Sequence, residues 1–213
     1  MKTYLATIQF LQKFFLSISI LIMLLLPLVL AFVPEMLSES TILRLYDISH
    51  MAMFLVMLVR PLADLFKEVT LIRPLVILRK GVGVFSASIV VSFIFAKIIM
   101  DPVGFFTSLS TKAYWPLEHF AVLGHLADIS AIILLITSNN FSKKVLGGMW
   151  KKIQKLSYVF FYASSFYVYL SYGNMSVLYS IIIITSITLL AYLRNRQPVT
   201  PVVPLTKAQP YIQ

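Results

Sequence analysis

The chain contains no cysteine among its 213 residues. Disulfide bonds, thiolate catalysis and cysteine-ligated metal centres are therefore excluded. Glycine is also scarce, and the seven glycines never form the G-x-G-x-x-G or G-x-x-x-x-G-K patterns that bind phosphates. No nucleophile–base pair or metal-ligand constellation is visible in the sequence. These absences disfavour a hydrolase or a transferase.

The chain is also poor in charged residues. Charged residues make up 12% of the chain, whereas hydrophobic residues make up 59% and the mean hydropathy is +0.89. Ordinary soluble domains carry about 25% charged residues. The apolar residues fall into blocks about as long as a helix needs to cross roughly 30 Å of hydrocarbon. The sequence therefore predicts an all-α, polytopic integral membrane protein: a bundle of six transmembrane helices in contact with the lipid bilayer.

We expect a single transmembrane domain over residues 1–196 and a disordered cytoplasmic tail over residues 197–213, which contains four prolines. Gly173 and Asn174 alone separate the last two spans, which predicts an antiparallel hairpin. The expected spans cover about residues 14–33, 45–62, 81–100, 115–138, 156–172 and 175–193.

Two segments near the N-terminal half need an interpretation of their own. The segment Val69–Leu78 is too short to span a bilayer and contains Arg73-Pro74, so we expect an interfacial piece. The first span could be a signal peptide, because Lys2 and Lys13 precede it. Its apolar run is longer than the roughly 7–15 residues typical of such a signal, which favours a retained helix.

The basic residues predict the orientation. With six spans, fifteen of the eighteen lysines and arginines fall on the side of the two termini, and Arg44, Lys97 and Lys112 fall on the other. By the positive-inside rule, both termini are cytoplasmic and the protein is a multi-pass protein of the inner (cytoplasmic) membrane. Topology and anionic headgroups account for the net charge of +10, so no nucleic-acid partner is expected. The fifteen are Lys2, Lys13, Arg60, Lys67, Arg73, Arg79, Lys80, Lys143, Lys144, Lys151, Lys152, Lys155, Arg194, Arg196 and Lys207.

Four motifs occur in order between residues 74 and 172. The first is "PLVILRKGVGVF" (Pro74–Phe85), a basic pair followed by a glycine at a helix entrance. The second is Gly124, thirteen residues before Thr137. The third is "TSNNFSKKVLGGMW", in which Trp150 again follows Thr137 by thirteen residues. The fourth is W-x-x-x-Q-x-L-x-Y, from Trp150 to Tyr158. In these motifs the chain resembles the ferric-reductase-like transmembrane domain family, and most of all the haem-binding membrane subunit of the bacterial periplasmic methionine sulfoxide reductase system.

The resemblance implies a six-helix bundle that holds b-type haem between histidines of facing helices and passes electrons across the membrane. It also implies that another chain, soluble or membrane-bound, is the redox partner. Matched position by position, however, the family's ligand histidines fall at Phe93, Gln154 and Tyr167. None of these side chains replaces imidazole as a strong ligand. Phe93 and Tyr167 are expected to fill the vacated haem cavity.

Three histidines remain: His50, His119 and His125. His50 and His125 lie on different expected spans, so the pair could ligate a relocated haem. The alternative is that His50 lies near the outer interface, satisfied by water or by Asp47. The second interpretation is the more common one for a lone histidine.

The fourth expected span is the most polar, with Glu118, His119, His125 and Asp128. Asp128 lies near its middle, where a charge is costly unless it is paired or neutralised. It could therefore belong to a proton path or a quinone head-group site. Alternatively it bonds His125, three residues away, or hydroxyls of the third span (Ser86, Ser88 and Ser92), and simply ties helices together. Glu118 and His119 lie where the span meets the outer surface, and solvation explains them.

Three functions follow from these observations. The first is a haem-free member of the family that acts as a membrane anchor or partner subunit. The second is a b-type haem electron carrier with the unusual ligands His50 and His125, or with a site completed by a partner. The third is a small proton-coupled transporter that uses Asp128 with His125. The first is favoured, because the expected ligand positions carry no histidine.

Overall fold

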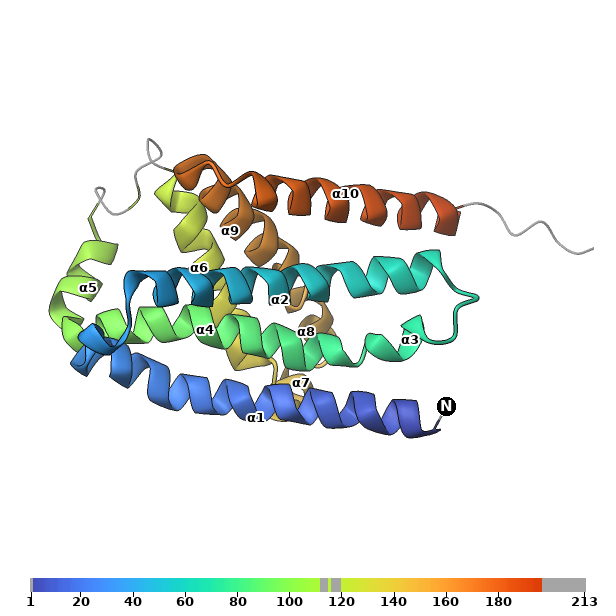
Figure 1. Cartoon of the computed structure of the whole chain (residues 1–213), viewed down its shortest axis with the longest axis horizontal. Coiled ribbons are helices and arrows are strands. Elements are labelled where there is room, and N and C mark those ends of the chain that lie inside the picture. The colour runs from blue at the N-terminus through green and yellow to red at the C-terminus, as the bar shows by residue number, and fades with distance from the viewer. Residues whose placement is uncertain (1, 112–114, 116–119, 197–213) are drawn as a thin grey trace, which may run out of the picture.

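The computed structural model describes residues 2–111, 115 and 120–196, and within these ranges the chain forms helices and no strand. The all-α prediction is therefore confirmed for the described part. Figure 1 shows most of the long helices running along one common direction, with α6 and α9 tilted across them. The helices are α1 (Lys2–Phe32), the 3-10 turn η1 (Pro34–Met36), α2 (Glu39–Leu65), α3 (Ile72–Leu75), α4 (Leu78–Met100), α5 (Pro102–Leu109), α6 (Ala121–Thr137), α7 (Asn140–Leu146), α8 (Gly148–Ile153), α9 (Leu156–Tyr172) and α10 (Met175–Arg196).

Four of the described helical segments are long and apolar enough to cross a membrane: α1, α2, α10 and the stretch Ile72–Met100 that joins α3 to α4. The pair α6 and α7, bent by 94°, makes a fifth if it is counted as one span. The helix α9 has 17 residues, which is the lower end of the length that crosses a bilayer. The structure thus supports a helical membrane protein with four or five long apolar helices. The count of six spans stays a prediction.

Several helices extend beyond the expected apolar blocks. The helix α1 begins at Lys2 instead of near residue 14, and α10 continues to Arg196. The helix α2 begins at Glu39 because the Ser38 hydroxyl accepts a hydrogen bond from the Thr41 backbone N–H and caps it. Hydropathy marks only the part of a helix that suits hydrocarbon, whereas capping and backbone geometry decide where the helix ends. The expected fourth span, 115–138, includes residues 116–119, which lie outside the described residues.

Short helices occupy segments that were expected only as connections. In α5, Pro102 stands at the first position and the Asp101 carboxylate accepts from the Gly104 backbone N–H at 2.8 Å. The helices α7 and α8 follow α6 and are separated by Gly147, which has a φ of +50°. This backbone conformation favours glycine. The hydropathy pattern missed these helices because they are short and partly polar.

The helix α4 lies at the centre of the bundle and packs against α1, α2 and α6. Small residues let its neighbours approach closely. A Cβ at Gly81 would lie 2.8 Å from the backbone oxygen of Gln12 in α1. Toward α2, the buried hydroxyls of Ser49 and Ser86 lie 3.0 Å apart, and each also donates to the other residue's backbone oxygen. A small residue and buried hydroxyls thus hold α1 and α2 against α4.

The two ends of the bundle differ in charge. The start of α1, the end of α2, the start of α4 and the end of α10 lie at one end, whereas α5 lies at the other (Figure 1). We call the first of these the basic end, because it carries basic residues from each of these helices. At this end Arg194 of α10 donates to the backbone oxygen of Leu65 and lies 3.9 Å from Glu68. The basic residues named for it are Lys2, Arg60, Arg79, Lys80, Arg194 and Arg196.

Candidate functional site

The position expected for the ligand of the third span is filled by aromatic packing. Phe93 of α4 is half-buried, and its ring stacks on the ring of Tyr46 in α2, with centroids 4.5 Å apart and planes 15° from parallel. A phenyl ring has no atom that ligates iron. Phe93 therefore contributes packing between α2 and α4.

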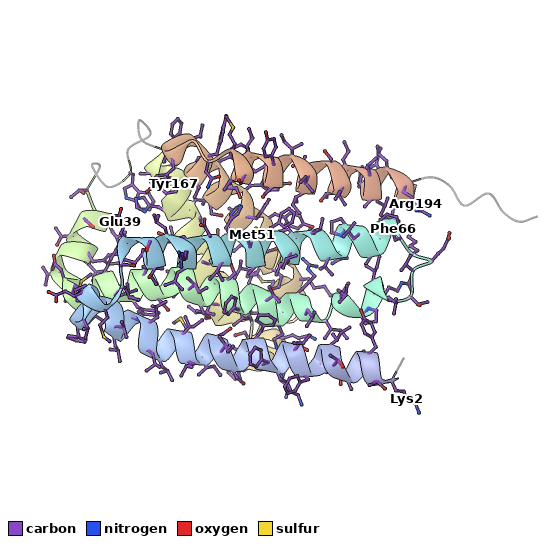
Figure 2. All side chains as sticks on the ribbon, viewed as in Figure 1. Lys2, Glu39, Met51, Phe66, Tyr167 and Arg194 are labelled. Carbon is purple, nitrogen blue, oxygen red and sulfur yellow. The ribbon has the colours of Figure 1, made fainter. Side chains whose placement is uncertain are left out.

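The position deep in α9 is filled in the same way. Tyr167 lies against Gly124 of α6, where an added Cβ would be 3.5 Å from three carbons of the ring. Its ring also meets that of Tyr172 edge-on, at 6.3 Å between centroids. Figure 2 places Tyr167 toward the end of the bundle that carries Glu39, away from Arg194. Gly124 is thus the small residue that lets this ring lie between α6 and α9.

The third expected position, Gln154, takes part in a hydrogen-bond network. Its side-chain amide donates to the hydroxyl of Thr137 at 3.3 Å. The indole N–H of Trp150 donates to the backbone oxygen of the same Thr137 at 2.9 Å, and the ammonium of Lys143 lies over the Trp150 ring. Thr137 and Trp150, thirteen positions apart in the sequence, are therefore hydrogen-bonded to each other. This bond holds α8 against the end of α6.

The structure gives His50 and His125 different neighbours. The His50 ring stacks on Phe161 of α9, with centroids 5.8 Å apart, and its Nε2 is buried without a hydrogen-bond partner among the described residues. The expected partner Asp47 does not form a hydrogen bond that would satisfy this atom. His125 meets the ring of Trp115 edge-on at 5.1 Å. Glu118 and His119, the other two polar residues expected near this surface, lie outside the described residues.

Asp128 lies half-buried in α6, within electrostatic range of Lys97 in α4 and of Tyr46 and Tyr167. Charged or phenolic groups from three other helices, α2, α4 and α9, therefore lie within electrostatic range of this carboxyl group. The serine hydroxyls that were possible partners are engaged elsewhere. Ser86 pairs with Ser49, Ser88 donates to Val84, and Ser92 donates to Ser88.

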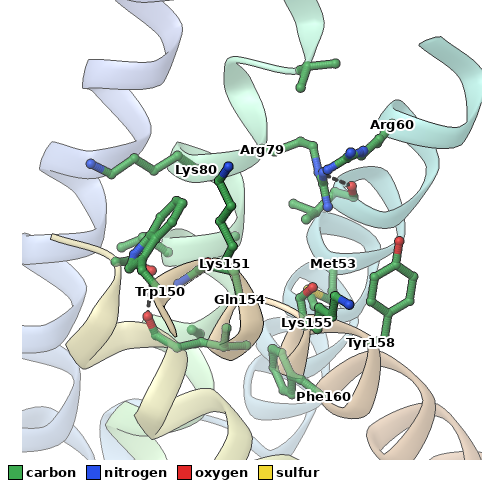
Figure 3. A pocket seen from close by; sticks show the side chains of 18 residues that line it. Met53, Arg60, Arg79, Lys80, Trp150, Lys151, Gln154, Lys155, Tyr158 and Phe160 are labelled. Carbon is green, nitrogen blue, oxygen red and sulfur yellow. Dashed lines mark hydrogen bonds between the residues drawn. The ribbon is translucent and has the colours of Figure 1, made fainter. Parts of the chain in front are cut away.

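A cavity of about 770 Å³ opens at the basic end, between α2, α4, α6, α8 and α9. Its deeper wall is apolar and includes Met53, Ala87, Leu134 and Phe160. Five basic side chains and no carboxylate are among the described residues that line it (Figure 3). The basic residues are Arg60, Arg79, Lys80, Lys151 and Lys155.

This cavity corrects one expectation from the sequence. The vacated haem space was expected to be filled, and at Phe93 and Tyr167 aromatic rings do pack. Beside Gln154, however, space remains between α4 and α9. No histidine is among the described residues that line this cavity. Met53 supplies the one thioether there, so the donor set does not fit a haem held by two imidazoles.

Sequence reasoning missed the cavity as a site. In the sequence, Arg79, Lys80, Lys151 and Lys155 served to orient the protein in the membrane, and Arg79 and Lys80 also formed the basic pair of the first motif. The available signal was their position near helix starts. Arg79 and Lys80 lie in the first turn of α4, and Lys155 directly precedes α9. Lys151 follows Trp150 in α8. Which of these basic residues face a common space depends on how the helices pack, and the sequence does not contain that information locally. Among the described residues, no group of three or more histidines and carboxylates could hold a metal ion.

Comparison with known protein families, with curated proteins and with solved structures finds no match to this chain. The likeness to the ferric-reductase-like domain therefore stays a prediction from the motifs.

Proposed function

We propose that this protein is a haem-free membrane subunit that keeps the six-helix arrangement of a ferric-reductase-like domain and serves as an anchor or partner subunit for another protein. In this proposal both termini lie on the cytoplasmic side of the inner membrane, where the basic end faces anionic headgroups.

The observation that carries the proposal is the state of the three expected ligand positions. Phe93 is stacked on Tyr46, Tyr167 lies against Gly124, and Gln154 donates to Thr137. Each side chain has a packing or hydrogen-bonding role that differs from iron ligation.

The contacts among the motif residues support the helical arrangement. Thr137 and Trp150, thirteen positions apart, are joined by a hydrogen bond. Gly124, thirteen positions before Thr137, faces Tyr167 across the α6–α9 contact. Motif residues thus contact either each other or an expected ligand position where helices pack.

A reduced-minus-oxidised absorption spectrum tests whether haem is bound. The full chain is expressed with haem supplied, purified in detergent and shown to be folded by circular dichroism. We expect no Soret or α band. A stoichiometric b-type spectrum would overturn the proposal, and His50→Ala and His125→Ala would then identify the ligands.

A restored site tests the helical arrangement. The triple variant Tyr46→Ala, Phe93→His, Tyr167→His removes the ring that covers residue 93 and places imidazoles on α4 and α9. We expect it to bind b-type haem. The matched control carries Tyr46→Ala with Phe95→His and Phe166→His, two exposed positions on the same helices, and is expected to bind none. A folded triple variant without haem bands would contradict the arrangement.

The partner is tested separately. The tagged chain is extracted from native membranes in mild detergent and its complexes are separated by size. We expect a second polypeptide in fixed stoichiometry, detected by cross-linking and mass spectrometry. Recovery of the chain by itself at every detergent concentration would contradict a partner-subunit role.

A second function is favoured by the surroundings of Asp128. A half-buried carboxyl near Lys97 and two tyrosines has the composition of a proton-accepting group inside a membrane bundle. If the protein is a proton-coupled transporter, Asp128→Asn abolishes proton uptake by proteoliposomes and leaves expression unchanged. Equal fluxes in both proteins would exclude this function.

A further inference from the structure

Two hollows meet at one arginine at the basic end. The basic cavity described above lies on one side of Arg79. On the other side, an apolar groove of about 570 Å³ runs between α1, α2 and α4. Both hollows are lined by Arg79 and Val56, and the Arg79 Nε–H donates to the Val56 backbone oxygen at 3.0 Å.

The contact with Val56 fixes the guanidinium between the two hollows. Because it uses only the Nε–H, the two terminal amino groups remain to bind a ligand. Arg79 is half-buried, so an anion held there is partly shielded from water and salt. Lys80 is also oriented, since its ammonium donates to the Asn140 side chain at 3.3 Å. Figure 3 shows Arg60 beside Arg79 at the cavity wall.

The groove offers a different surface. Apart from Asp47 and Arg79, its lining is apolar, with Phe15 from α1, Leu55 from α2 and Val82 from α4. Along α2 it extends from Asp47 to Val59, which is about 18 Å at 1.5 Å per residue. One leaflet of a hydrocarbon core is about 15 Å thick. The groove therefore has the length and polarity of a single acyl chain.

We propose that the basic cavity and the apolar groove together form a binding site for one anionic phospholipid. The phosphate binds Arg79 with Lys80, Lys151 and Lys155, and one acyl chain lies in the groove between α1, α2 and α4. Basic pockets between transmembrane helices are the sites where anionic headgroups bind. The negatively charged headgroup is complementary to a cavity lined by five basic side chains. The acyl chain fills an apolar groove that a free phosphate would leave empty.

The test uses the purified full chain after delipidation, with bound lipid counted by native mass spectrometry. The probes are dioleoyl phosphatidylglycerol, dioleoyl phosphatidylcholine, dihexanoyl phosphatidylglycerol and inorganic phosphate. We expect one long-chain phosphatidylglycerol to bind at least about tenfold more tightly than phosphatidylcholine, because phosphatidylglycerol carries a net negative charge whereas the choline group offsets the phosphate charge. The short-chain lipid should bind more weakly than the long-chain one, because it cannot fill the groove.

Two charge-matched variants separate the site from general basicity. Lys80→Gln, Lys151→Gln, Lys155→Gln removes three cavity lysines and should lower the affinity for phosphatidylglycerol to that for phosphatidylcholine. Lys67→Gln, Lys144→Gln, Lys152→Gln removes three exposed lysines that do not line the cavity, and should leave the preference unchanged. All six side chains are exposed, so both variants should fold.

Three outcomes overturn the proposal. Equal affinity for the two long-chain lipids removes the anion specificity. An equal loss in both lysine variants means that overall charge, and not the cavity, attracts the lipid. Full displacement by inorganic phosphate, with no dependence on chain length, assigns the cavity to a soluble phosphate and excludes the lipid.

Discussion

The ring of Tyr46 lies on the ring of Phe93, with centroids 4.5 Å apart and planes 15° from parallel. This pair joins α2 to α4 at the position where the resemblance to a haem protein expects an iron ligand. Under the haem-free function proposed above, these stacked rings supply contacts between α2 and α4 that do not depend on a cofactor.

Removal of the Phe93 ring should therefore weaken the bundle. We expect Phe93→Ala to lower the free energy of unfolding by about 2 kcal/mol, because it leaves a void and ends a stacked pair. Intrinsic fluorescence during heating or denaturation in detergent measures the change. Phe95→Ala, at an exposed position on the same helix, is the control and should change little. Equal losses in the two variants would show that the Tyr46 contact is not stabilising.

Gly81 should tolerate no side chain. A Cβ there would lie 2.8 Å from the Gln12 backbone oxygen, so Gly81→Ala must push α1 away from α4. We expect a loss of about 1–3 kcal/mol, the usual cost of overpacking. Gly83→Ala is the matched control, because its Cβ would meet only Val56 side-chain carbons at 3.8 Å or more. The measurement is thermal unfolding of both variants in the same detergent. Equal stability of Gly81→Ala and Gly83→Ala would contradict the close α1–α4 contact.

The reciprocal bonds of Ser49 and Ser86 should show energetic coupling. A double-mutant cycle with Ser49→Ala and Ser86→Ala is expected to give a coupling energy of about 0.6 kcal/mol, and at most about 1.7 kcal/mol, as for other interhelical hydrogen bonds in membranes. Ser88 bonds within its own helix to Val84. A cycle of Ser49→Ala with Ser88→Ala should therefore give no coupling.

Trp150→Phe should loosen the segment between α6 and α9. The substitution keeps an aromatic ring but removes the indole N–H that donates to Thr137, so that carbonyl loses a partner. We expect a loss of about 1 kcal/mol and faster amide hydrogen exchange confined to α7 and α8. Unchanged hydrogen exchange in α7 and α8 would mean that the Trp150–Thr137 bond does not hold these helices against α6. Tyr192→Phe, at an exposed site on α10, provides a comparison on a distant surface.

Much of the helical architecture could be predicted from the sequence, because the length and polarity of a membrane-crossing segment are local properties. The range expected for the fifth span, 156–172, coincides with α9. The short helices α5, α7 and α8 could not be found in this way, since caps and glycine conformations at Asp101 and Gly147 define them. Hydropathy does not register such features.

Of the candidate site, the sequence identified the three positions without histidine and the polar residues of the fourth span. It also established that no cysteine or phosphate loop is present, and it predicted a helical membrane protein. It did not determine which side chains meet. The contact of Tyr46 with Phe93 joins residues 47 positions apart, and the basic cavity draws Arg60, Arg79 and Lys151 from three helices.

These relationships arise from the rotation and spacing of packed helices, which small residues such as Gly81 and Gly124 allow. A sequence states which residues lie on each helix. Only the packing of the helices decides that the rings of Tyr46 and Phe93 stack and that five basic side chains line one cavity, because those contacts connect residues far apart in the chain.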